Sequence, residues 1–514
     1  MYRSSNKILV QTMVNFRRHF SNQRSAVLNE VVILDAVRTP IGSFQSSLSS
    51  QSATQLGGVA VKGLLDRTGI APEKVNEIYM GNVCSAGLGQ APARQAAIFA
   101  GLPEKTICTT VHKVCASGLK AVTLATQTLM LGRQNVIVAG GMESMSNVPF
   151  YLKRGVTPYG GVNLVDGIVF DGLTDVYNKF HMGNCAENTA KKYNITRQEQ
   201  DTYAINSYKR SAESWAKNLF KDEIVPVTIK PKRGPEVVVS EDEEYKRIDF
   251  DRFGKLSTVF QRENGTVTAG NASTLNDGAS ALLLATADEA NRLNLKPLAR
   301  IVDFQDAETA PIDFPIAPAL AVPPLLERNN LTKNDISLWE FNEAFAVVIC
   351  ANGKILDIGM DRVNVRGGAI SLGHPIGCSG ARILTTLVHA LKPNEYGVAG
   401  ICNGGGGATN VLVQKLSGDD INMQSNALQQ KPILTLYTKY PCPLCDELVG
   451  ELTPFMHRLH LEKVDITKPE NRQYFKQYRY DIPVLHINGE FLCMHRLDAE
   501  LLDTKLNELQ NASG

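Results

Sequence analysis

Two cysteines and a histidine stand in strings of small residues that leave space for a reacting molecule. Cys115 lies in VHKVCASGL, after β-branched residues and directly before a predicted helix. Backbone N–H groups and the macrodipole at a helix start favour an anion, so this position predicts a thiol of lowered pKa and a nucleophilic thiolate. The alternative is a buried structural cysteine, which is the commoner fate of this residue type.

His374, in SLGHPIGCSGAR, precedes a second predicted helix and is a candidate general base toward a thiol. Cys402 ends a predicted strand in ICNGGGG, where the glycine run exposes backbone N–H groups that stabilise an oxyanion. A phosphate cradle is the alternative, but the Lys-Ser/Thr pair of a P-loop does not follow. Asn342, in NEAF, offers an amide that orients a water or a carbonyl. These motifs together supply a nucleophile, a base and oxyanion donors.

An internal duplication predicts that these distant motifs meet. Short strings recur at an offset of about 260 residues, and asparagines Asn82 and Asn342 each follow one copy of the first string. The matched strings are 70–78 with 330–338, Ala116-Ser117-Gly118 with Cys378-Ser379-Gly380, and Val138-Ala139-Gly140-Gly141 with Ile401-Cys402-Asn403-Gly404. Two facing copies of one α/β fold place loops from both halves around one site, so we expect the four motifs to converge there.

The elements that must position these residues alternate between helix and strand, as in α/β proteins. We predict a strand over 30–36, a helix over 120–131 and a strand over 135–139. A less regular, more charged segment follows from about 151. A polar stretch without periodicity, 417–431, is typical of a linker and separates a last α/β unit.

The four motifs together resemble the signatures of the thiolase family. VCASGLKA at Cys115, NEAF at Asn342, GHPIG at His374 and CNGGGG at Cys402 carry the resemblance, which runs over about 31–415. It implies an α/β fold class with two facing βαβαβαββ copies, layered α-β-α-β-α. It also implies an N-terminal thiolase domain over 30–292, with an inserted loop domain over about 151–268, and a C-terminal thiolase domain over 293–416.

The resemblance assigns roles to the motif residues. Cys115 accepts the acyl group, His374 activates it, and Cys402 moves the α-proton of a second acyl-CoA. Asn342 holds a water that makes one oxyanion hole with Nε2 of His374, and the backbone N–H groups of Cys115 and Gly404 make the other. Holding the acyl group on Cys115 makes the carbon–carbon step effectively unimolecular. The implied reaction is the reversible condensation of two acetyl-CoA to acetoacetyl-CoA and CoA.

Within the family, the middle of the chain is similar to the potassium-activated acetoacetyl-CoA thiolases of mitochondria. INSYKRS, EDEEYKR, TAGNASTLNDG and IDFPIAP carry this similarity. The resemblance implies no obligatory cofactor but K⁺ as an activator, bound mostly by main-chain oxygens, which suit a hard cation. Its implied ligands are Tyr208, Ala269, Gly270, Ala272 and Ile370. Gly270 stands where alanine is usual and Ile370 where valine is usual, and backbone ligation tolerates both.

The resemblance also implies residues for the substrate. Arginines suit the phosphates of CoA, and Arg252 stands where lysine is usual. The implied CoA residues are Tyr208, Arg247, Arg252 and Ser273, with His181 and Met182 lining the acyl pocket. Phe314-Pro315 resembles a feature associated with 2-methylacetoacetyl-CoA, and a plain turn is the alternative. The activity implied belongs to fatty-acid, ketone-body and isoleucine metabolism; the alternative within the family is a long-chain 3-ketoacyl-CoA thiolase.

Composition and charge exclude several classes of protein. Hydrophobic residues make up 43% and charged residues 20%, and the formal net charge is +1. A basic nucleic-acid binder and a disordered acidic chain are therefore excluded. No apolar run reaches the roughly 18 residues of a membrane span. Ten cysteines are too dilute for a disulfide framework. By family resemblance we expect a homotetramer.

The N-terminal segment differs from the rest of the chain in charge. It contains Arg3, Lys7, Arg17, Arg18 and Arg24 but no acidic residue before Glu30, and it is rich in serine. This composition predicts a mitochondrial transit peptide over 1–29 and a matrix location. The alternative is an N-terminal tail without a targeting role.

The last unit, 432–510, has its own chemistry. Cys442-Pro443-Leu444-Cys445 follows a short strand and opens a helix, and the order β-Cys-x-x-Cys-α-β-α-β-β-α is thioredoxin-like. Cys442 is the predicted attacking thiol and Cys445 the resolving one, and Pro483 matches the cis-proline that borders such sites. A zinc half-site is the alternative, but the candidate further ligands are poorly spaced: His457, His460 and Cys493.

This unit resembles the small glutaredoxin-like family, which implies glutathione or another thiol as partner. Its CPLC differs from the usual CPYC, so a thioredoxin-like fold without turnover is an alternative. Thiolases do not normally carry such a tail, which is either a genuine fusion or two adjacent genes joined. From other functional classes, the alternatives are a redox protein with the thiolase part as passenger or target, and a silent acyl-CoA-binding protein. The intact four motifs argue against the last.

Overall fold

The computed structural model describes residues 28–156, 158–231, 233–417, 432–456 and 458–511. They form two compact units, one ending at Ser417 and one beginning after it. The predicted transit peptide, except Leu28 and Asn29, and the predicted linker, except Ser417, lie outside the described residues. Among the helices described, none combines the length and the apolar character that crossing a bilayer requires.

The first copy of the duplicated fold is a mixed sheet with strand order β4-β3-β5-β12-β1. β3 is parallel to both β4 and β5, whereas β12 is antiparallel to β5 and β1. β1 and β12 are buried along their whole lengths, so their sequences are nearly continuous in small and apolar residues. The bounds are β1 Val31–Arg38, β3 Glu77–Gly81, β4 Ile107–Val111, β5 Val136–Ser144 and β12 Asn276–Thr286, with β2 (Gly42–Ser43) paired to β12.

The second copy repeats this arrangement in the order β14-β15-β16-β13. β14 is parallel to β15, and β16 is antiparallel to β15 and β13. Pairing of β1 with β13 joins the two sheets. The common strand order and directions confirm the predicted duplication. The bounds are β13 Ala299–Glu308, β14 Ile336–Phe341, β15 Tyr396–Asn403 and β16 Gly407–Lys415.

One predicted match of the duplication is wrong in register. Tyr79 of β3 pairs with Ala139, and the corresponding Trp339 of β14 pairs with Val398. Strands β5 and β15 therefore match Val138 with Gly397, four residues before the predicted partner Ile401. Runs of small residues occur several times at these strand ends, so a short string alone does not fix the register.

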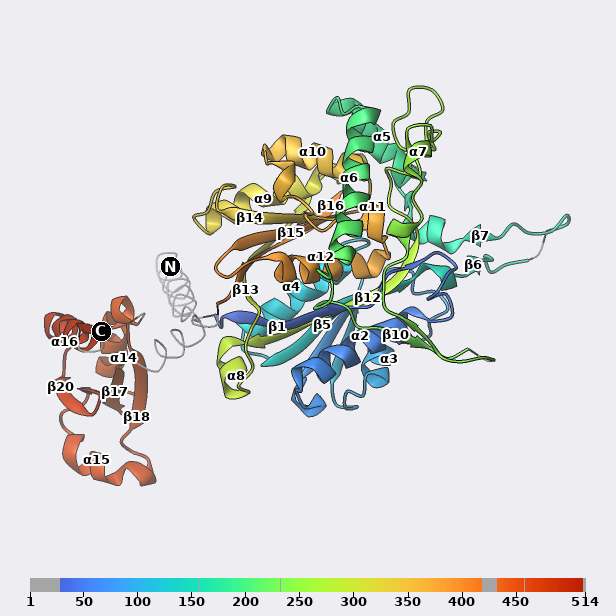
Figure 1. The fold of residues 1–514 in the computed structure, drawn as a ribbon. Helices are drawn as coiled ribbons and strands as arrows, with labels where there is room; N and C mark the ends of the chain where they lie inside the picture. Colours follow the sequence, from blue (N-terminus) through green and yellow to red (C-terminus); the bar gives the residue numbers. More distant parts are fainter. Residues whose placement is uncertain (1–27, 157, 232, 418–431, 457, 512–514) are drawn as a thin grey trace, which may run out of the picture. The chain divides into compact units, whose positions relative to one another are not determined.

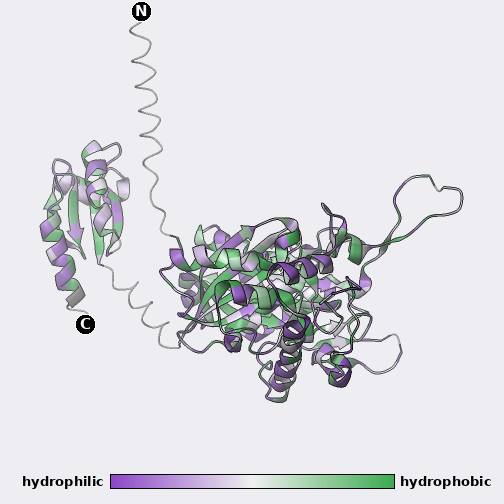
Figure 2. Ribbon diagram, turned by 90° about the horizontal axis from the view of Figure 1, so that it is seen from above, coloured by the Kyte–Doolittle hydropathy of each residue, from purple (hydrophilic) through white to green (hydrophobic). Residues whose placement is uncertain are grey.

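Helices complete five layers, α-β-α-β-α, as predicted (Figure 1). α2 and α3 cover the outer face of the first sheet, α9 and α10 cover that of the second, and α4 and α12 lie between the sheets. Hydrophobic residues concentrate in the strands and inner helices, and hydrophilic ones on the outer helices (Figure 2). The bounds are α2 Ala53–Thr68, α3 Pro92–Phe99, α4 Ser117–Met130, α8 Ala287–Arg292, α9 Ala317–Arg328, α10 Ala346–Leu356 and α12 Ile376–Ala390.

Small residues let the two central helices approach closely at their N-terminal ends. A Cβ on Gly118 of α4 would lie 2.8 Å from the Ala381 nitrogen, and one on Gly380 of α12 would lie 2.4 Å from the Leu119 nitrogen. A Cβ on Gly81 would lie within 3.0 Å of both helix starts, at the Gly118 nitrogen and the Gly377 oxygen. The ASG and CSG strings are thus needed to bring the loops that precede α4 and α12 together.

The segment inserted in the first copy is more regular than its sequence suggests. Its longest element is α6 (Arg197–Ala216), which begins with a capping box in which Thr196 and Glu199 satisfy each other's backbone N–H groups. α6 packs on α10 and on the short α11 (Ala369–Leu372) of the second copy. The other bounds are β6 Phe150–Tyr151, β7 Val165–Asp166, β8 Thr174–Asp175, β9 Phe180–His181, α5 Met182–Lys192, β10 Val227–Ile229, β11 Val237–Val239 and α7 Phe250–Phe253.

The C-terminal unit has the predicted thioredoxin-like order of elements. Its sheet runs β18-β17-β19-β20, with β18 parallel to β17 and the other pairs antiparallel. The first helix ends at Glu451, earlier than the predicted end near Arg458. The bounds are β17 Ile433–Thr438, α14 Pro443–Glu451, β18 His460–Asp465, α15 Arg472–Tyr478, β19 Val484–Ile487, β20 Glu490–Met494 and α16 Ala499–Asn511.

Candidate active site

The environment of His374 fixes which ring nitrogen carries a proton. Nδ1 lies 2.6 Å from the Ser379 hydroxyl, which also lies 3.0 Å from the Pro375 carbonyl oxygen. The hydroxyl has one proton and donates it to that carbonyl, so it accepts from Nδ1–H. Nε2 then keeps its lone pair, and it is buried without a hydrogen-bond partner in the described structure. Burial, with a contribution from the Arg382 cation, lowers the pKa of His374 to about 3 and keeps the ring neutral. The ring is therefore neutral, and Nε2 is the ring atom whose lone pair is free to accept a proton.

The Asn342 side chain is a second buried group without a partner. Its backbone N–H donates to the Gly400 oxygen at 3.0 Å, but neither amide atom forms a hydrogen bond within the described residues. An unpaired buried amide is costly, and in native proteins such groups generally face a water or a ligand. The Asn342 amide and Nε2 of His374 are therefore buried polar groups that remain available to a bound molecule.

Cys115 and Gly404 lie together although they come from different copies. Burial raises the pKa of the Cys115 thiol to about 11, and hydrogen bonds from the backbone N–H groups of Gly404 and of Cys115 itself oppose that rise. The lowered thiol pKa expected from the helix start is wrong, because burial outweighs those donors. A neutral thiol needs a base to react, and the two N–H groups at the Cys115 sulphur are donors of the kind that stabilise an oxyanion.

Cys402, at the end of β15, lies near the same centre. Burial raises the pKa of its thiol well above the ordinary value, and the neighbouring Cys115 adds to the rise. Its side chain is fully buried. The structure therefore brings together two neutral thiols and two backbone donors, with the Gly404 backbone following Cys402 by two residues.

A cavity of about 620 Å³ opens beside this centre. Val114, Met182 and Gly404 are among the residues that line it, and a Cβ on Gly404 would lie 3.4 Å from the Met182 sulphur. The predicted acyl-pocket residue Met182 thus borders the backbone donor. His181 caps α5, where Nδ1 accepts from the Gly183 N–H at 3.0 Å, and its ring stacks on Phe260 at 4.7 Å. Burial lowers the pKa of His181.

Phe314 and Pro315 lie in a 3-10 helix (Pro311–Ile316) that packs on α5 and on strands β15 and β16. Phe314 is almost fully buried, and the Pro315 oxygen accepts from the Asn352 amide at 2.7 Å. The 3-10 helix that carries the pair therefore lies between α5 and β15 and packs on both.

The predicted CoA residues are more scattered. Ser273 donates to the Ala344 oxygen at 2.9 Å and so lies beside the NEAF turn. Arg247 and Arg252 are exposed on the segment that leads into and through α7, with Arg247 3.8 Å from Glu244. The structure therefore places Ser273 beside the turn that contains Asn342 and leaves both arginines exposed on the surface.

The residues predicted to hold K⁺ are linked through α6, α7 and α11. The rings of Tyr208 and Phe253 lie 6.3 Å apart, and a Cβ on Gly270 would lie 2.8 Å from the Phe253 ring. Ile370 precedes Ser371, whose hydroxyl lies 2.9 Å from that of Ser207. In the described part of the chain no hydrogen bond reaches the Tyr208 hydroxyl or four carbonyl oxygens, those of Ala269, Gly270, Ala272 and Ile370. These free oxygens fit a hard cation.

Several buried residues that support the site were missed by sequence reasoning. Ser379 sets the tautomer of His374, and the Asn276 amide oxygen accepts the His374 backbone N–H at 2.9 Å. Glu143 accepts from the N–H groups of Val83 and Gly377, each at 3.0 Å. Burial raises the pKa of Glu143 to about 7. The only signal in the sequence was a charged residue, Glu143, within an otherwise apolar and glycine-rich strand.

A further buried carboxylate, Glu343, follows Asn342 directly. It accepts from the Tyr203 and Ser207 hydroxyls, both at 2.7 Å, and from the Ile370 N–H at 3.0 Å. Glu343 therefore ties α6 to the backbone of both Asn342 and Ile370, two residues with predicted roles.

In the C-terminal unit, Cys442 caps the start of α14, and Cys445 donates to its sulphur at 2.7 Å. Both are buried and free. Burial, with the bond to Cys442, raises the pKa of Cys445 to about 11.

The Ile482–Pro483 peptide is cis. Leu444 is exposed, and Tyr437, Tyr474 and Tyr478 pack into the hydrophobic cluster of the cysteine pair. Among the described residues no group of His, Cys, Asp and Glu could hold a metal, and His457 lies outside them.

The fold and the convergent thiols define an acyl-transferring α/β enzyme of the duplicated type. Residues 31–288 match the family model described as "Thiolase, N-terminal domain", and 295–415 match "Thiolase, C-terminal domain". The chain belongs to the thiolase family. Residues 433–507 match "Glutaredoxin-like domain".

Relatives of the whole thiolase part are similar in sequence and structure. Over 389 residues the chain is 65% identical to the mitochondrial acetyl-CoA acetyltransferase of Bos taurus, covering 76% of this chain and 92% of the relative. It is 63% identical to that of Homo sapiens, with 76% and 91% covered. The Acat5 thiolase from Ascaris suum in complex with coenzyme A matches with a TM-score of 0.73, 48% identity, and 75% and 100% covered. The Bacillus anthracis acetyl-CoA acetyltransferase matches with a TM-score of 0.74, 38% identity, and 76% and 100% covered.

Proposed function

We propose that the thiolase part is an acetyl-CoA C-acetyltransferase, which condenses two acetyl-CoA to acetoacetyl-CoA and CoA and also runs the reverse thiolysis. The observations that carry this proposal are two buried polar groups of the motif residues without partners, and the contact of Cys115 with a backbone donor of the other copy. Nε2 of His374 and the Asn342 amide lack partners in the described structure, and Cys115 faces the Gly404 N–H. The relatives named as acetyl-CoA acetyltransferases support the same substrate.

In the first half-reaction, Nε2 of His374 takes the proton of Cys115 as the sulphur attacks the thioester carbonyl of acetyl-CoA. This transfer is required because burial holds the pKa of that thiol at about 11. The oxyanion lies against the N–H groups of Cys115 and Gly404. The carbon–sulphur bond to CoA then breaks, and the leaving CoA thiolate takes the proton of Cys402. The products are acetyl-Cys115, protonated His374, a Cys402 thiolate and free CoA.

In the second half-reaction, the Cys402 thiolate takes an α-proton from a second acetyl-CoA. The enolate oxygen is stabilised by Nε2–H of His374 and by a water held on the Asn342 amide. The enolate carbon attacks the acetyl carbonyl, and the bond to Cys115 breaks. The Cys115 thiolate regains its proton from His374, so all three groups return to their starting states. Condensation and thiolysis use the same residues in opposite order.

The length of the acyl chain that the enzyme cleaves depends on the walls of its pocket. We infer that acetoacetyl-CoA and 2-methylacetoacetyl-CoA are thiolysed in preference to long chains, because buried Phe314 walls the region between α5 and β15. The test is a thiolysis assay with these two substrates and a long-chain 3-ketoacyl-CoA. A faster rate with the long chain would establish the alternative, a long-chain thiolase. CoA itself is a substrate or product here, with Tyr208, Arg247, Arg252 and Ser273 as its proposed contacts and His181 beside the acyl group.

We propose K⁺ as an activator of this enzyme. Its support is the set of free oxygens on Tyr208, Ala269, Gly270, Ala272 and Ile370, which would hold the ion. A bound cation would fix the backbone between α6 and the substrate region. Thiolysis of acetoacetyl-CoA should rise when Na⁺ is replaced by K⁺ at constant ionic strength, and equal rates in the two salts would contradict the proposal.

The proposed location is the mitochondrial matrix, supported by the basic leader and by relatives named as mitochondrial. We also propose a homotetramer and the domain boundaries 1–29, 30–292, 293–416, 417–431 and 432–510. Import of the full chain into isolated mitochondria tests the matrix location. Light scattering of the purified protein tests the homotetramer. A monomeric mass would contradict the tetramer.

A second function is proposed for the C-terminal unit, thiol–disulfide exchange. It is supported by Cys442 at the start of α14 with buried Cys445 directly behind it. Cys442 would attack a substrate disulfide, which releases one thiol and forms a mixed disulfide with Cys442. Cys445 would then attack this mixed disulfide, release the second thiol and form the Cys442–Cys445 disulfide, which two molecules of glutathione or another thiol would reduce again. Disulfide reduction by the full chain should be lost in Cys442→Ser. Thiolase activity should persist in that variant, and its loss would favour the alternative in which the thiolase part serves the redox unit.

A further inference from the structure

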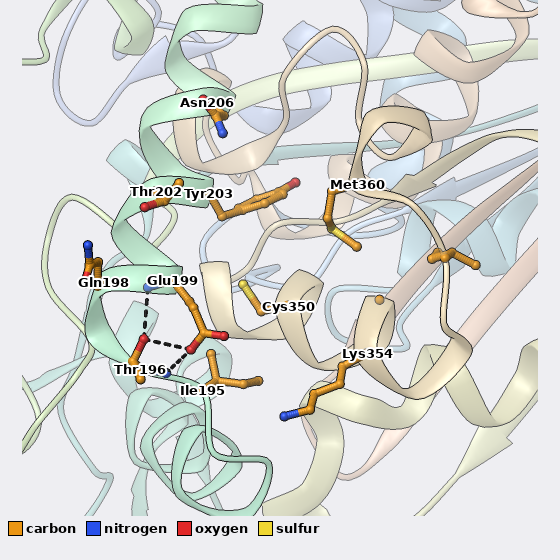
Figure 3. Close-up of a pocket in the computed structure, with 12 residues that line it drawn as sticks. Ile195, Thr196, Gln198, Glu199, Thr202, Tyr203, Asn206, Cys350, Lys354 and Met360 are labelled. Atoms are coloured by element: carbon orange, nitrogen blue, oxygen red, sulfur yellow. Dashed lines mark hydrogen bonds between the residues drawn. The ribbon is translucent and has the colours of Figure 1, made fainter.

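A second cavity lies away from the thiols, between the start of α6 and the end of α10. Its volume is about 700 Å³, within the range of small-molecule sites. Glu199 and Tyr203 come from α6, and Cys350 and Lys354 from α10 (Figure 3). Neither cysteine of the proposed reaction lines it, nor do His374 and Asn342. This cavity is therefore separate from the acyl site.

The inner wall of the cavity is apolar. The Tyr203 ring, Ile358 and Met360 line it together with the Cys350 sulphur, which points inward in Figure 3. Burial, with the charge of Glu199, raises the pKa of Cys350 to about 12. The thiol is therefore neutral and behaves as a small hydrophobic group, so that the wall suits an apolar body and not a covalent attachment.

Two opposite charges flank this apolar wall. One Glu199 carboxylate oxygen accepts from the Thr196 N–H at 2.6 Å and its hydroxyl at 2.7 Å, whereas the other accepts no hydrogen bond from the described residues. Lys354 donates to the Tyr193 oxygen at 2.9 Å and has further N–H groups available. The Lys354 charge contributes to lowering the pKa of Glu199, yet no ion pair joins the two among the described residues, and both side chains are exposed. Both charges are therefore available to a ligand that enters the cavity.

We propose that this cavity binds a small amphiphilic zwitterion, with its ammonium on Glu199, its carboxylate on Lys354 and its apolar body on Tyr203 and Met360. An apolar α-amino acid and a short apolar peptide share this chemistry and differ in the distance between their charges. A molecule with opposite charges at its two ends pairs with Glu199 and Lys354 at the same time, whereas a simple acid or amine pairs with only one of them.

The cavity also has a hydrogen-bonded connection to the acyl site. The Tyr203 hydroxyl donates to Glu343 at 2.7 Å, and the other oxygen of Glu343 accepts the Ile370 N–H at 3.0 Å. Glu343 follows Asn342, and the Ile370 oxygen is a proposed ligand of K⁺. A ligand that presses on the Tyr203 ring is thereby coupled to the K⁺ region; this second part of the inference rests on the proposed function.

Calorimetric titration of the full chain tests the binding. The probes are L-phenylalanine and L-leucyl-L-phenylalanine, with 3-phenylpropanoate and 2-phenylethylamine as singly charged analogues of the same body. We expect one saturable site per chain for at least one zwitterion, and affinities about tenfold or more weaker for both analogues. The zwitterion that binds more tightly indicates which distance between ammonium and carboxylate the site prefers. Absence of saturable zwitterion binding, or equal affinity for an analogue, overturns the proposal.

Charge-removing variants locate the site. Glu199→Gln keeps a capping-box residue at the start of α6, so it removes the charge without removing the cap. This variant and Lys354→Met should each weaken zwitterion binding about tenfold or more. The matched control is Glu213→Gln, an exposed carboxylate on the same helix, which should bind as the parent does. Unchanged affinity in both Glu199→Gln and Lys354→Met overturns the assignment to this cavity.

The coupling is tested by reciprocity, since two linked sites change each other's affinity by the same factor. The affinity for the zwitterion should differ between K⁺ and Na⁺ buffers in the parent protein. Tyr203→Phe keeps the ring but removes the bond to Glu343, so it should bind the probe and lose that difference. Equal affinities in the two salts overturn the coupling alone. Thiolysis of acetoacetyl-CoA measured on the same samples shows separately whether the proposed function stands.

Discussion

The two copies of the thiolase fold treat equivalent asparagines in opposite ways. In the first copy the Asn82 amide donates to Glu143 at 2.8 Å and to the Met142 oxygen at 3.2 Å, and its oxygen accepts from Ser85 at 2.6 Å. In the second copy the Asn342 amide has no partner among the described residues. The same strand end thus carries a satisfied structural amide in one half and an available one in the other.

The neighbouring strands explain this difference. Glu143 lies two residues beyond Gly141, which pairs with Gly81, and Cys402 lies two residues beyond Gly400, which pairs with the matching Phe341. Glu143 accepts from the Asn82 amide at 2.8 Å, whereas no hydrogen bond of the described residues reaches the Asn342 amide. Duplication therefore supplied one scaffold, and a carboxylate in the first copy, where the second has a thiol, pairs one asparagine and leaves the other without a partner.

The largest expected effect breaks the chemistry outright. Cys115→Ala removes the nucleophile, so acetyl labelling by radiolabelled acetyl-CoA should vanish and thiolysis should fall by at least about 10⁴-fold. The control is Cys108→Ala, a half-buried cysteine on β4 outside the centre, which should label normally. Labelling that persists in Cys115→Ala would contradict the assignment of the nucleophile.

The next effect tests the comparison of the two asparagines directly. Asn342→Ala should lower kcat by about 10²–10³-fold through loss of an oxyanion-hole component. It should leave stability nearly unchanged, because no hydrogen bond of the described structure is lost from the amide. Asn82→Ala should instead cost about 1–3 kcal/mol of stability, because it removes the amide that donates to buried Glu143. Urea unfolding and steady-state kinetics of both variants check this, and the reverse pattern would refute it.

A smaller effect concerns the proton on His374. Ser379→Ala removes the acceptor of Nδ1–H, so the ring samples the tautomer that blocks Nε2, and kcat should fall by about 10- to 100-fold. Ser371→Ala serves as a comparison, since that buried serine bonds to α6 and not to the histidine. Equal losses in both variants would show that packing, and not the tautomer, is responsible.

The smallest effect is a dependence of stability on pH. His374 has a pKa of 6.5 in the unfolded chain and about 3 when folded, so protons bind the unfolded state more strongly between these values. Its contribution to stability is complete above pH 6.5 and is lost as the pH falls toward 3. Urea unfolding between pH 7 and pH 4.5 should therefore show a steeper decline for the parent than for His374→Asn. Parallel declines would mean that this histidine is not buried as a neutral base.

The extra C-terminal unit has its own simple check. A single tryptic or chymotryptic peptide that spans Leu416 to Leu434, detected in the natural protein, would show that the fusion is genuine. Two separate mature chains would mean that the thiolase and glutaredoxin-like units are products of adjacent genes.

The sequence allowed the duplicated fold and the four motif residues to be predicted because their signals are local. Glycines in these strings mark places where an added Cβ would lie within 3.0 Å of a neighbouring backbone, and apolar runs in the sequence mark the strands. The state of the Cys115 thiol was predicted wrongly, since a helix start favours the anion but burial raises its pKa to about 11. Burial is a property of the whole packed structure, so a local motif does not report it.

By itself, the sequence determined which residue types were available for chemistry: two thiols, an imidazole, an amide and a run of backbone donors. Tertiary structure alone decided their working states. It set the His374 tautomer through Ser379, left Asn342 without a partner while Glu143 satisfied Asn82, and opened the cavity between α6 and α10. The physical reason is that hydrogen-bond partners and burial come from segments far apart in the chain, which meet only when both copies fold against each other.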